Sequence, residues 1–574
     1  MKKSEQSGKP KGSNKQILIN LLVTAVVGAV YFYISLPAIN LQANEFYSFV
    51  VVLCVAYVLS ALVTSGFQTQ MSASSKGQVK TYFHFIKQRC LPVGILLAAM
   101  IIIAVVGQII SLPIFRAGAY RDLLTVESGE FAQDISQISF NEIPTLDKYS
   151  AEYLGDRQMG TLSDMVSQFE YAGNSTQINY QGRPVRVAPI AYADLIKWFT
   201  NRGTGLPAYV LVDMVTQEAQ VIRLNEGMKY SFSEPLNRNI MRHLRFQYPT
   251  FMFSTPRFEI DEDGQPWWIA PKIVKTIGLF GGVDIQGAVL CNAITGESQY
   301  YEEVPTWVDN VYTPQLIMQQ YDYHGTLVNG FINSILGQRD VTVTTTGYNY
   351  IALNDDVYVY TGVTSANSDQ SNLGFLLSNQ RTKETIFYDA PGATEVAAQA
   401  SAEGVVQDLG YKATFPLLIN VVGQPTYFIP LQDNTLLVKS YAMVNVAQYQ
   451  IVATGSTVSQ CEQQYIRMLS EKGITQEEEL PQTQATGTVA EIRSAVLDGN
   501  TWYYVRLEGE QVFYALSAAQ NQLAVILNVG DKVTIDHAVS EAESSILDGY
   551  SLSISGKSSV NPQTELTLPE TTVS

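Results

Sequence analysis

Histidine is scarce in this 574-residue chain, and its arrangement does not suggest metal binding. The four histidines are isolated (His84, His243, His324 and His537), with no H-x-H or H-x-x-x-H pair. The chain also lacks the G-x-S-x-G, P-loop and S-x-x-K motifs. The sequence therefore predicts no cofactor, no metal and no catalytic residues, and it favours a protein that is not an enzyme.

Cysteine is equally scarce. Cys54 and Cys90 lie in or beside apolar segments, which leaves Cys291 and Cys461 in the rest of the chain. A disulfide between Cys291 and Cys461 is one interpretation, and two unpaired, partly buried thiols are the other.

Basic residues are depleted beyond residue 112. Residues 1–112 hold nine Lys or Arg and two acids of the chain's 36 and 53, which leaves 27 basic and 51 acidic residues beyond them. This large region, with a formal charge of −24, lacks the clustered Lys and Arg that phosphate binding requires. We therefore expect no nucleic acid partner, and the sequence leaves the oligomeric state unknown.

Three apolar segments have the length of membrane-spanning helices. Residues 17–36, 46–63 and 91–110 contain few polar and no charged residues. A hydrocarbon core of about 30 Å needs about 20 helical residues, and a backbone in lipid must satisfy its own hydrogen bonds. The sequence predicts a multi-pass protein of the cell membrane, with the lipid bilayer as a partner.

The charges between these segments predict the orientation of the chain. The N-terminal tail carries five Lys, residues 37–45 carry no base, and residues 64–90 carry four bases and no acid. By the positive-inside rule, the N-terminus is cytoplasmic and the large region after Pro113 is extracytoplasmic. The alternative, a cytoplasmic C-terminal region, requires one segment not to cross.

The large region is rich in Tyr, Val and Thr with alternating apolar residues, which predicts a β-rich structure with a few helices. A turn pattern recurs three times, as Asp213-x-x-Thr216-x-Glu218, Asn292-x-x-Thr295-x-Glu297 and Asn379-x-x-Thr382-x-Glu384. An Asp or Asn can accept a hydrogen bond from the backbone two residues on and start a turn, so each pattern predicts a hairpin.

Other local patterns predict helices and turns. Helical spacing is found in residues 162–172, 191–202 and 393–411, the last ending at Gly410, and a hairpin turn is expected at Gln181-Gly182. Gly-Gln-Pro flanked by strands occurs at 264–266 and 423–425.

This order of helix, strand, Gly-x-Pro turn, strand and a strand ending in N-x-x-T-G-E resembles the PepSY-type module. The likeness is best in residues 258–301, with an unusual insertion at 270–287, and 393–452 is a second candidate. The resemblance implies a small α+β unit outside a bacterial membrane. GDRQMG (155–160), IGLFGG (277–282) and GQPTYFIPL (423–431) also resemble large three-span membrane proteins of Gram-positive bacteria with no assigned activity.

The end of the chain has a different pattern. Residues 487–555 contain alternating strands and a V-G-D-x-V turn, and they are similar to the OB-fold, a small β-barrel.

The fold class is therefore a membrane-anchored multidomain protein with three transmembrane α-helices, an α+β, β-rich region of PepSY-like modules and a C-terminal small β-barrel. The expected segments are a cytoplasmic basic tail (1–16), the transmembrane anchor (17–112), an extracytoplasmic α+β membrane-proximal region (113–255), extracytoplasmic PepSY-like modules (256–473), a linker (474–486), an OB-like barrel (487–555) and a disordered tail (556–574).

Two sets of residues are candidate contact sites. Arg238, Arg242 and Arg245 have helical spacing and form a possible face for a polyanion; an internal salt-bridge strip is the alternative. Trp267, Trp268, Trp307 and Trp502 could contact a ligand, and core packing is the alternative. The acids at 261–263 and 355–356 could bind Ca²⁺ or simply form solvated turns.

These observations favour a non-catalytic, membrane-tethered binding or scaffold protein of the bacterial cell envelope. Its partners would be other envelope proteins or cell-wall polymer. One alternative is a regulator of an envelope peptidase, or a cell-wall hydrolase itself. A second is a subunit of a membrane secretion or conjugation assembly.

Overall fold

The computed structural model describes residues 14–64, 76–135, 143–353, 355–366, 371–475, 483–497, 500–518, 521–537 and 546–557. The chain forms two compact units. Unit 1 comprises Met1–Phe131 and Asn141–Thr394, and unit 2 comprises Ala132–Phe140 and Glu395–Ser574. The sequence-based segment 256–473 therefore contributes to both units. Most of the expected tails (1–13 and 558–574) and of the expected linker (476–482) lies outside the described residues.

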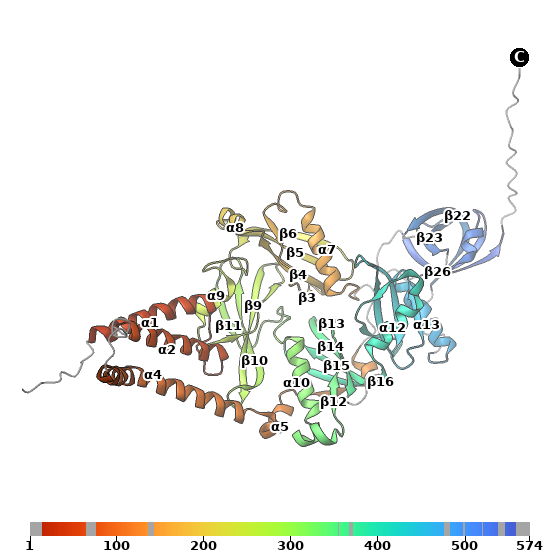
Figure 1. The fold of residues 1–574 in the computed structure, drawn as a ribbon. Helices are drawn as coiled ribbons and strands as arrows, with labels where there is room; N and C mark the ends of the chain where they lie inside the picture. Colours follow the sequence, from red (N-terminus) through yellow and green to blue (C-terminus); the bar gives the residue numbers. More distant parts are fainter. Residues whose placement is uncertain are drawn as a thin grey trace, which may run out of the picture. The chain divides into compact units, whose positions relative to one another are not determined.

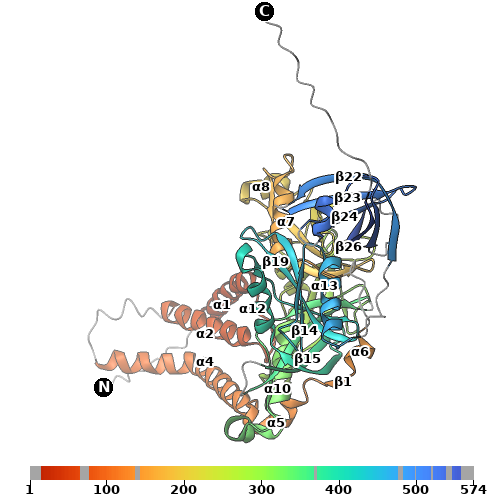
Figure 2. The same ribbon diagram turned by 90° about the vertical axis from the view of Figure 1, so that its right-hand side faces the viewer.

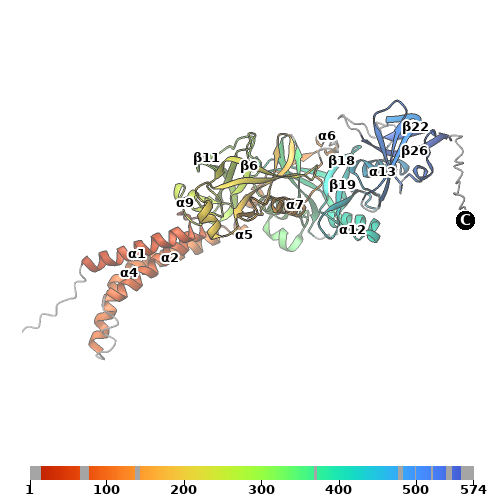
Figure 3. The same ribbon diagram turned by 90° about the horizontal axis from the view of Figure 1, so that it is seen from above.

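The three apolar segments are helices: α1 (Asn14–Ser35), α2 (Asn44–Thr64) and α4 (Lys76–Ile110). Each contains a stretch long and apolar enough to cross a membrane, at Lys15–Ser35, Asn44–Thr64 and Cys90–Ile110, which confirms that the three predicted segments are helices of spanning length. The three helices project together from unit 1 (Figures 1 and 3). The buried Asn20 on α1 accepts hydrogen bonds from Ser60 and Thr64 on α2, so its polar group is satisfied between the helices.

The β-rich region is a fourfold repeat of a helix followed by a five-stranded sheet. In every sheet, a short strand and the first hairpin strand both pair with one long strand, and two further strands follow it in antiparallel order. Because the same pairing recurs four times along the chain, the turn patterns in the sequence mark repeating supersecondary units. The first three repeats belong to unit 1 and the fourth to unit 2.

Repeat 1 comprises α7 (Lys148–Gly160), β2 (Phe169–Tyr171), β3 (Thr176–Tyr180), β4 (Arg183–Tyr192), α8 (Leu195–Asn201), β5 (Leu206–Asp213) and β6 (Ala219–Met228). Repeat 2 comprises α9 (Ile240–Gln247), β7 (Met252–Phe253), β8 (Arg257–Ile260), β9 (Pro266–Ile277), β10 (Gly281–Asn292) and β11 (Ser298–Tyr301).

Repeat 3 comprises α10 (Pro314–Thr326), α11 (Gly330–Ile332), the π-helical turn η1 (Asn333–Gly337), β12 (Thr342–Thr344), β13 (Asn349–Leu353), β14 (Asp356–Ser365), β15 (Ser371–Asn379) and β16 (Thr385–Ala393). Its sheet is extended by β1 (Glu127–Gly129), which pairs in parallel with β16. Before β1, the short helix α5 (Pro113–Arg121) follows α4, and α6 (Phe131–Asp134) comes after β1.

Repeat 4 comprises α12 (Glu395–Val405), β17 (Lys412–Ala413), β18 (Leu417–Val421), β19 (Gln424–Gln432), β20 (Val438–Asn445) and β21 (Val452–Gly455). Helix α13 (Val458–Glu471) follows it and packs on β20 and β21. Figure 2 shows α12 and α13 beside the strands of this repeat.

The three recurring turns form as their residue types predict. The Oδ1 atom of Asp213 accepts the N–H groups of Val215 and Thr216, and Asn292 and Asn379 make the equivalent two bonds in repeats 2 and 3. A left-handed residue follows at the same position in each turn: Gln217, Gly296 or Lys383. The three predicted hairpins are therefore confirmed, as is the hairpin at Gln181-Gly182.

Two of the three helices predicted in this region are confirmed, and one is wrong. Helix α8 lies within 191–202 because Asp194 caps it through the N–H groups of Ile196 and Lys197, and α12 lies within 393–411. The helix expected at 162–172 is wrong, because that segment consists of turns and β2. The helix of repeat 1 is α7, which begins where Asp147 caps the N–H of Ser150.

Helix α10 packs between two sheets of unit 1. Leu316 belongs to the core of repeat 2 with Leu290, whereas Ile317 and Tyr321 belong to a core with Val359 of repeat 3. Because adjacent residues of one helix enter both cores, repeats 2 and 3 share a continuous packed interior.

The C-terminal strands of unit 2 are β22 (Thr483–Leu497), β23 (Asn500–Leu507), β24 (Phe513–Ser517), β25 (Lys532–His537) and β26 (Ile546–Gly556). They pair in the ring order β22-β23-β24-β26-β25 around buried Val489, Val505, Leu516 and Val533. Residues 483–486 belong to β22 and not to a linker, because they pair with β25.

Candidate functional site

Two of the three candidate arginines hold the end of a transmembrane helix. The Arg242 guanidinium donates to the carbonyl of Tyr33 (3.1 Å), and Arg245, only 4% exposed, donates to that of Leu36 (2.9 Å). Both carbonyls lie at the C-terminal end of α1, where four backbone acceptors lack partners within the helix. A cation also interacts favourably with the negative end of the helix dipole.

Other contacts also involve the residues of the predicted polyanion face, which stays a prediction. Arg242 also donates to the carbonyls of Pro235 and Leu236, and Arg245 donates to that of Phe251. Arg238 precedes α9 and donates to the carbonyl of Arg202 (2.7 Å). Among the described residues, the hydrogen-bond acceptors of all three guanidinium groups are backbone carbonyls, which does not support an internal salt-bridge strip.

The insertion at 270–287 forms the long β9–β10 hairpin, whose tip contacts the end of α4. The Ser111 hydroxyl oxygen accepts the N–H groups of Leu279 and Phe280, each at 3.0 Å. A Cβ atom added at Gly107 would lie 2.7 Å from Leu279 and 2.9 Å from Phe280. The absence of a side chain at Gly107 thus allows the hairpin tip to pack against the helix.

The connection between α1 and α2 also contacts repeat 2. The N–H of Ile39 donates to the carbonyl of Pro249 (2.8 Å), and the Gln42 side chain donates to that of Lys275 (3.0 Å). The end of α1, the start of α2 and the end of α4 therefore all meet the same repeat. Repeat 2 and the connection at 36–43 lie at the same end of the transmembrane helices.

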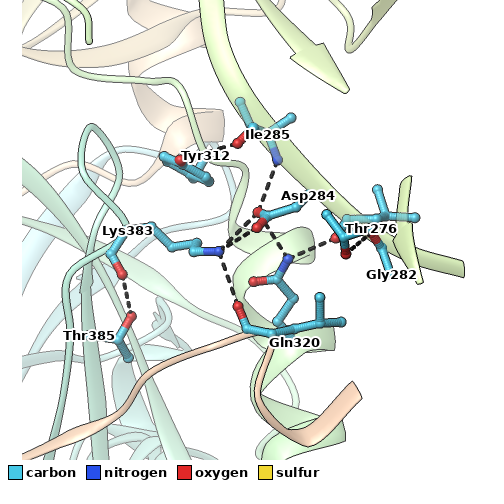
Figure 4. Close-up of polar contacts among 10 residues, drawn as sticks. Thr276, Gly282, Asp284, Ile285, Tyr312, Gln320, Lys383 and Thr385 are labelled. Carbon is cyan, nitrogen blue, oxygen red and sulfur yellow. Dashed lines mark hydrogen bonds and ion pairs between the residues drawn. The ribbon is translucent and has the colours of Figure 1, made fainter. Parts of the chain in front are cut away.

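A partly buried ion pair joins repeats 2 and 3 (Figure 4). Lys383, at the left-handed position of the β15–β16 turn, lies 2.8 Å from an oxygen of Asp284 on β10, and both side chains are less than a fifth exposed. The Lys383 ammonium also donates to the carbonyl of Leu123, and Gln320 on α10 donates to Asp284 (3.2 Å). The pair thus links two sheets, a helix and the segment that follows α5.

A second polar centre lies where β3 and β8 meet. The carboxylate of Glu259, on β8, accepts the N–H groups of Asp309 and Asn310, both at 3.0 Å. The carboxylate of Asp309 accepts the N–H of Asn179, on β3, at 2.7 Å. Glu259 and Asp309 are 0% and 1% exposed, so this acid pair lies fully inside unit 1.

The surroundings of the acid pair favour its protonated forms. Burial raises the pKa of Glu259 to about 7, although backbone N–H groups and Arg257 oppose the change. Burial and the neighbouring Glu259 carboxylate hold the pKa of Asp309 well above its usual range. The acid pair can therefore hold a proton at a pH at which exposed carboxyl groups have lost theirs.

Arginines and amides surround the acid pair. Arg257 donates to the amide oxygen of Asn310 (3.1 Å), whose own nitrogen donates to the carbonyl of Gln177 on β3 (2.8 Å). Arg186, on β4, is buried and lies over the ring of Tyr350 of repeat 3. Repeats 1, 2 and 3 thus contribute to one polar network.

The acid pair is suited to holding repeats together and not to cleaving a substrate. Its oxygens are enclosed, and three of the four accept backbone N–H groups, whereas a glycosidase needs two carboxyl groups that flank a bound bond. In the described part of the chain, no group of three or more His, Cys, Asp or Glu side chains is placed to hold a metal ion.

The four candidate tryptophans have different environments. Trp268 and Trp502 are buried, and Trp268 donates to the carbonyl of Tyr230, which favours core packing over ligand contact for both. Trp267 and Trp307 are half-buried and lie 5.7 Å apart between ring centroids. Both pack against the core of repeat 2, which favours core packing for them also.

Cys291 and Cys461 are both free, so the disulfide is absent. Each thiol is enclosed in its own unit, Cys291 on β10 and Cys461 on α13, where it lies 3.5 Å from the carbonyl of Ala453. Burial raises the pKa of Cys291 to about 12 and that of Cys461 further, so both remain thiols.

The acidic side chains at 261 and 356 bond to residues of their own repeats. Asp261 accepts the N–H groups of Asp263 and Gln265 and the indole N–H of Trp267. Asp356 forms a 2.6 Å ion pair with Arg381. These contacts favour the solvated-turn and structural interpretations over a calcium site.

Sequence reasoning did not identify Glu259 and Asp309. Fifty residues separate them, and they are two of many acids. Their sequence neighbours could have identified them, because each acid lies among large apolar residues, in RFEI and WVDNVY. An acid in such a run is expected to be paired or hydrogen-bonded.

No protein-family model matches this chain, and no curated protein matches its sequence. Among solved structures, a levansucrase variant complexed with sucrose aligns with a TM-score of 0.19 and 7% identity, over 74% of this chain and 96% of that one. A levansucrase variant from B. megaterium aligns with a TM-score of 0.17 and 10% identity, over 75% of this chain and 97% of that one. Scores this low do not define a shared fold.

Proposed function

We propose that this chain is a membrane-tethered, non-catalytic binding or scaffold protein of the bacterial cell envelope, with its repeats outside the cytoplasm. The orientation rests on the lysines near α1 and α4 and on the positive-inside rule. The supporting observation is the attachment of repeat 2 to the end of α1, through Arg242 and Arg245, and to the end of α4, through Ser111. Such an attachment suits a protein that holds a partner at a fixed position above the bilayer.

The finer assignments support the same proposal. The order of helix, hairpin and hairpin in each repeat is compatible with PepSY-like modules, and the ring of five C-terminal strands is compatible with an OB-like barrel. PepSY-like modules would keep open the alternative of a peptidase regulator. The enclosed Glu259 and Asp309 carboxyl groups weigh against a hydrolase, because a substrate cannot reach them.

Protease treatment of intact cells tests the location. The repeats should be degraded while a fragment containing α1, α2 and α4 survives. Protection of the whole chain until the membrane is permeabilised would overturn the extracytoplasmic assignment.

Crosslinking in native membranes, followed by copurification in mild detergent, tests the scaffold role. A scaffold should retain specific envelope proteins or cell-wall polymer, and Glu262→Gln, in an exposed turn, should not reduce their recovery. Recovery of the chain alone, with or without crosslinking, would contradict the role.

A further inference from the structure

Two groups of exposed apolar side chains flank the place where the transmembrane helices leave unit 1. Contiguous exposed apolar surface is uncommon on a water-facing domain and usually marks a contact. In both Figure 1 and Figure 2, α8 and α5 lie at opposite edges of unit 1, and α1, α2 and α4 leave between them.

The first group, lobe 1, lies on α8 and the segments around α9. The large apolar side chain of Ile196, on α8, is 72% exposed. The large exposed side chains of lobe 1 are Leu195, Ile196, Phe199, Phe232, Leu236 and Phe246. Lobe 1 also carries Arg202, whose guanidinium lies over the rings of Trp198 and Phe199. Apolar, aromatic and basic residues together are typical of a membrane interface.

Lobe 1 is held directly against α1. The ring of Phe246 lies 5.4 Å from that of Phe32 in an edge-to-face arrangement. Phe246 also lines an apolar groove of about 500 Å³ with Gly28, Phe32 and Leu53 of the spanning helices. The apolar surface of the membrane helices therefore continues onto Phe246 of lobe 1.

The second group, lobe 2, lies on α5, α11 and η1. Leu336 is 81% exposed, the largest value among these side chains. The large exposed side chains of lobe 2 are Ile114, Phe115, Ile332, Ile335 and Leu336. Arg116 and Arg339 are exposed on the same segments.

Lobe 2 is fixed to the end of α4. Helix α5 begins at Pro113, three residues after α4 ends at Ile110, and the Tyr120 hydroxyl donates to the carbonyl of Ser111 (2.6 Å). Tyr120 packs in one cluster with Leu327 and Phe331, which carry α11. Lobe 2 thus keeps a constant position relative to the point where the chain leaves the bilayer.

We propose that lobes 1 and 2 insert into the interfacial layer of the bilayer that α1, α2 and α4 cross. The lipid is favoured as the occupant because both surfaces are continuous with spanning helices and carry arginines that can meet lipid phosphates. Unit 1 then rests on the membrane at two points as well as through its helices. This proposal does not depend on which side of the membrane the repeats occupy.

Depth-dependent fluorescence quenching tests this proposal. Ile196→Cys and Leu336→Cys variants of the full chain carry an environment-sensitive thiol label in phosphatidylcholine–phosphatidylglycerol nanodiscs, with and without bromine near the upper acyl carbons. The unmodified chain gives the labelling background. Tyr149→Cys is the control, since Tyr149 is an exposed residue of α7 outside both lobes.

Brominated lipid should lower the fluorescence at both lobes about twofold and leave the control unchanged. If either label behaved like the control, insertion at two points would be wrong. A label that is blue-shifted but unquenched would show that protein covers the lobe, and this too would overturn the proposal. Phe199→Cys and Ile332→Cys replace any variant that does not fold.

Discussion

The first hairpin strands of repeats 2 and 4, β8 and β18, occupy the same place in the repeat and bury different chemistry. β8 (RFEI) carries Glu259 and Arg257 into a polar network shared with β3 and the 305–311 segment. β18 (LLINV) is buried along its whole length, and its Asn420 donates to the carbonyl of Ile135 (2.7 Å). The repeat thus fixes the position of the strand, and its side chains decide what it attaches to.

The helices that open these two repeats differ in the same way. α9 carries Arg242 and Arg245 to the end of α1, whereas α12 (EVAAQASAEGV) contains no basic residue. Repeat 2 therefore joins the anchor to its neighbours through charged and polar groups. Repeat 4 uses an apolar strand and a small-residue helix within unit 2.

Among the substitutions that test this comparison, Glu259→Gln should lower the stability of unit 1 the most. A glutamine side chain cannot accept both N–H groups, so one buried donor loses its partner, and we expect unit 1 to lose about 3 kcal/mol. Thermal unfolding of the full chain in nanodiscs measures the change. The control is Glu262→Gln, in the exposed turn after β8. Equal unfolding temperatures for the two variants would show that the polar strand is not what holds the repeats together.

Arg245→Met should have the next largest effect, about 2 kcal/mol, because three backbone carbonyls lose a buried donor. The matched control is Arg223→Met, which removes an exposed ion pair with Asp164 and should cost under about 1 kcal/mol. Limited proteolysis within 36–43 provides the measurement. If Arg245→Met did not change the cleavage rate, Arg245 would not be what attaches repeat 2 to the end of α1.

Gly296→Ala tests whether the left-handed position of the recurring turn tolerates a side chain in repeat 2, as it does in repeats 1 and 3. Gln217 and Lys383 hold this left-handed position in repeats 1 and 3, but a Cβ at Gly296 would lie 2.2 Å from the Tyr230 ring. We expect a loss of about 2 kcal/mol by thermal unfolding. Gly182→Ala has a similar positive φ with open space around it and should cost about 1 kcal/mol. Equal costs would show that the Tyr230 ring moves aside.

The stability of unit 1 should also depend on pH through Glu259. Its pKa is about 7 in the folded protein and about 4.3 in an unfolded chain, so the folded state binds this proton more tightly. The contribution of Glu259 to stability is therefore greatest at low pH and falls as the pH rises through 7, by about 1 kcal/mol between pH 6 and pH 8. Glu259→Gln should flatten this profile and Glu262→Gln should not. If the stability of the parent chain rose between pH 6 and pH 8 while that of Glu259→Gln did not, the raised pKa assigned to Glu259 would be contradicted.

The sequence was a good guide wherever the cause of structure is local. The three spans follow from hydropathy, and the hairpins follow from Asp213, Asn292 and Asn379, whose side chains bond to backbone two and three residues on. Helix α7 was missed because its apolar spacing is weak, and its start depends on the Asp147 cap.

Sequence reasoning failed wherever partners are distant along the chain. Arg242 and Arg245 have helical spacing, yet their partners Tyr33 and Leu36 lie about two hundred residues earlier. Glu259 and Asp309 meet because β8 and the segment before α10 converge on β3, and no local pattern encodes that convergence. Exposed apolar residues such as Leu336 could be identified only when burial was known.

The central claim is that the anchor and the repeats of unit 1 form one continuous body. Its most direct test is oxidation of an Ile39→Cys, Pro249→Cys double variant in native membranes, because the N–H of Ile39 donates to the carbonyl of Pro249 at 2.8 Å. Peptide mass spectrometry should detect an intramolecular disulfide in this variant and none in an Ile39→Cys, Tyr149→Cys control. No disulfide in the first variant, or equal amounts in both, would contradict the account.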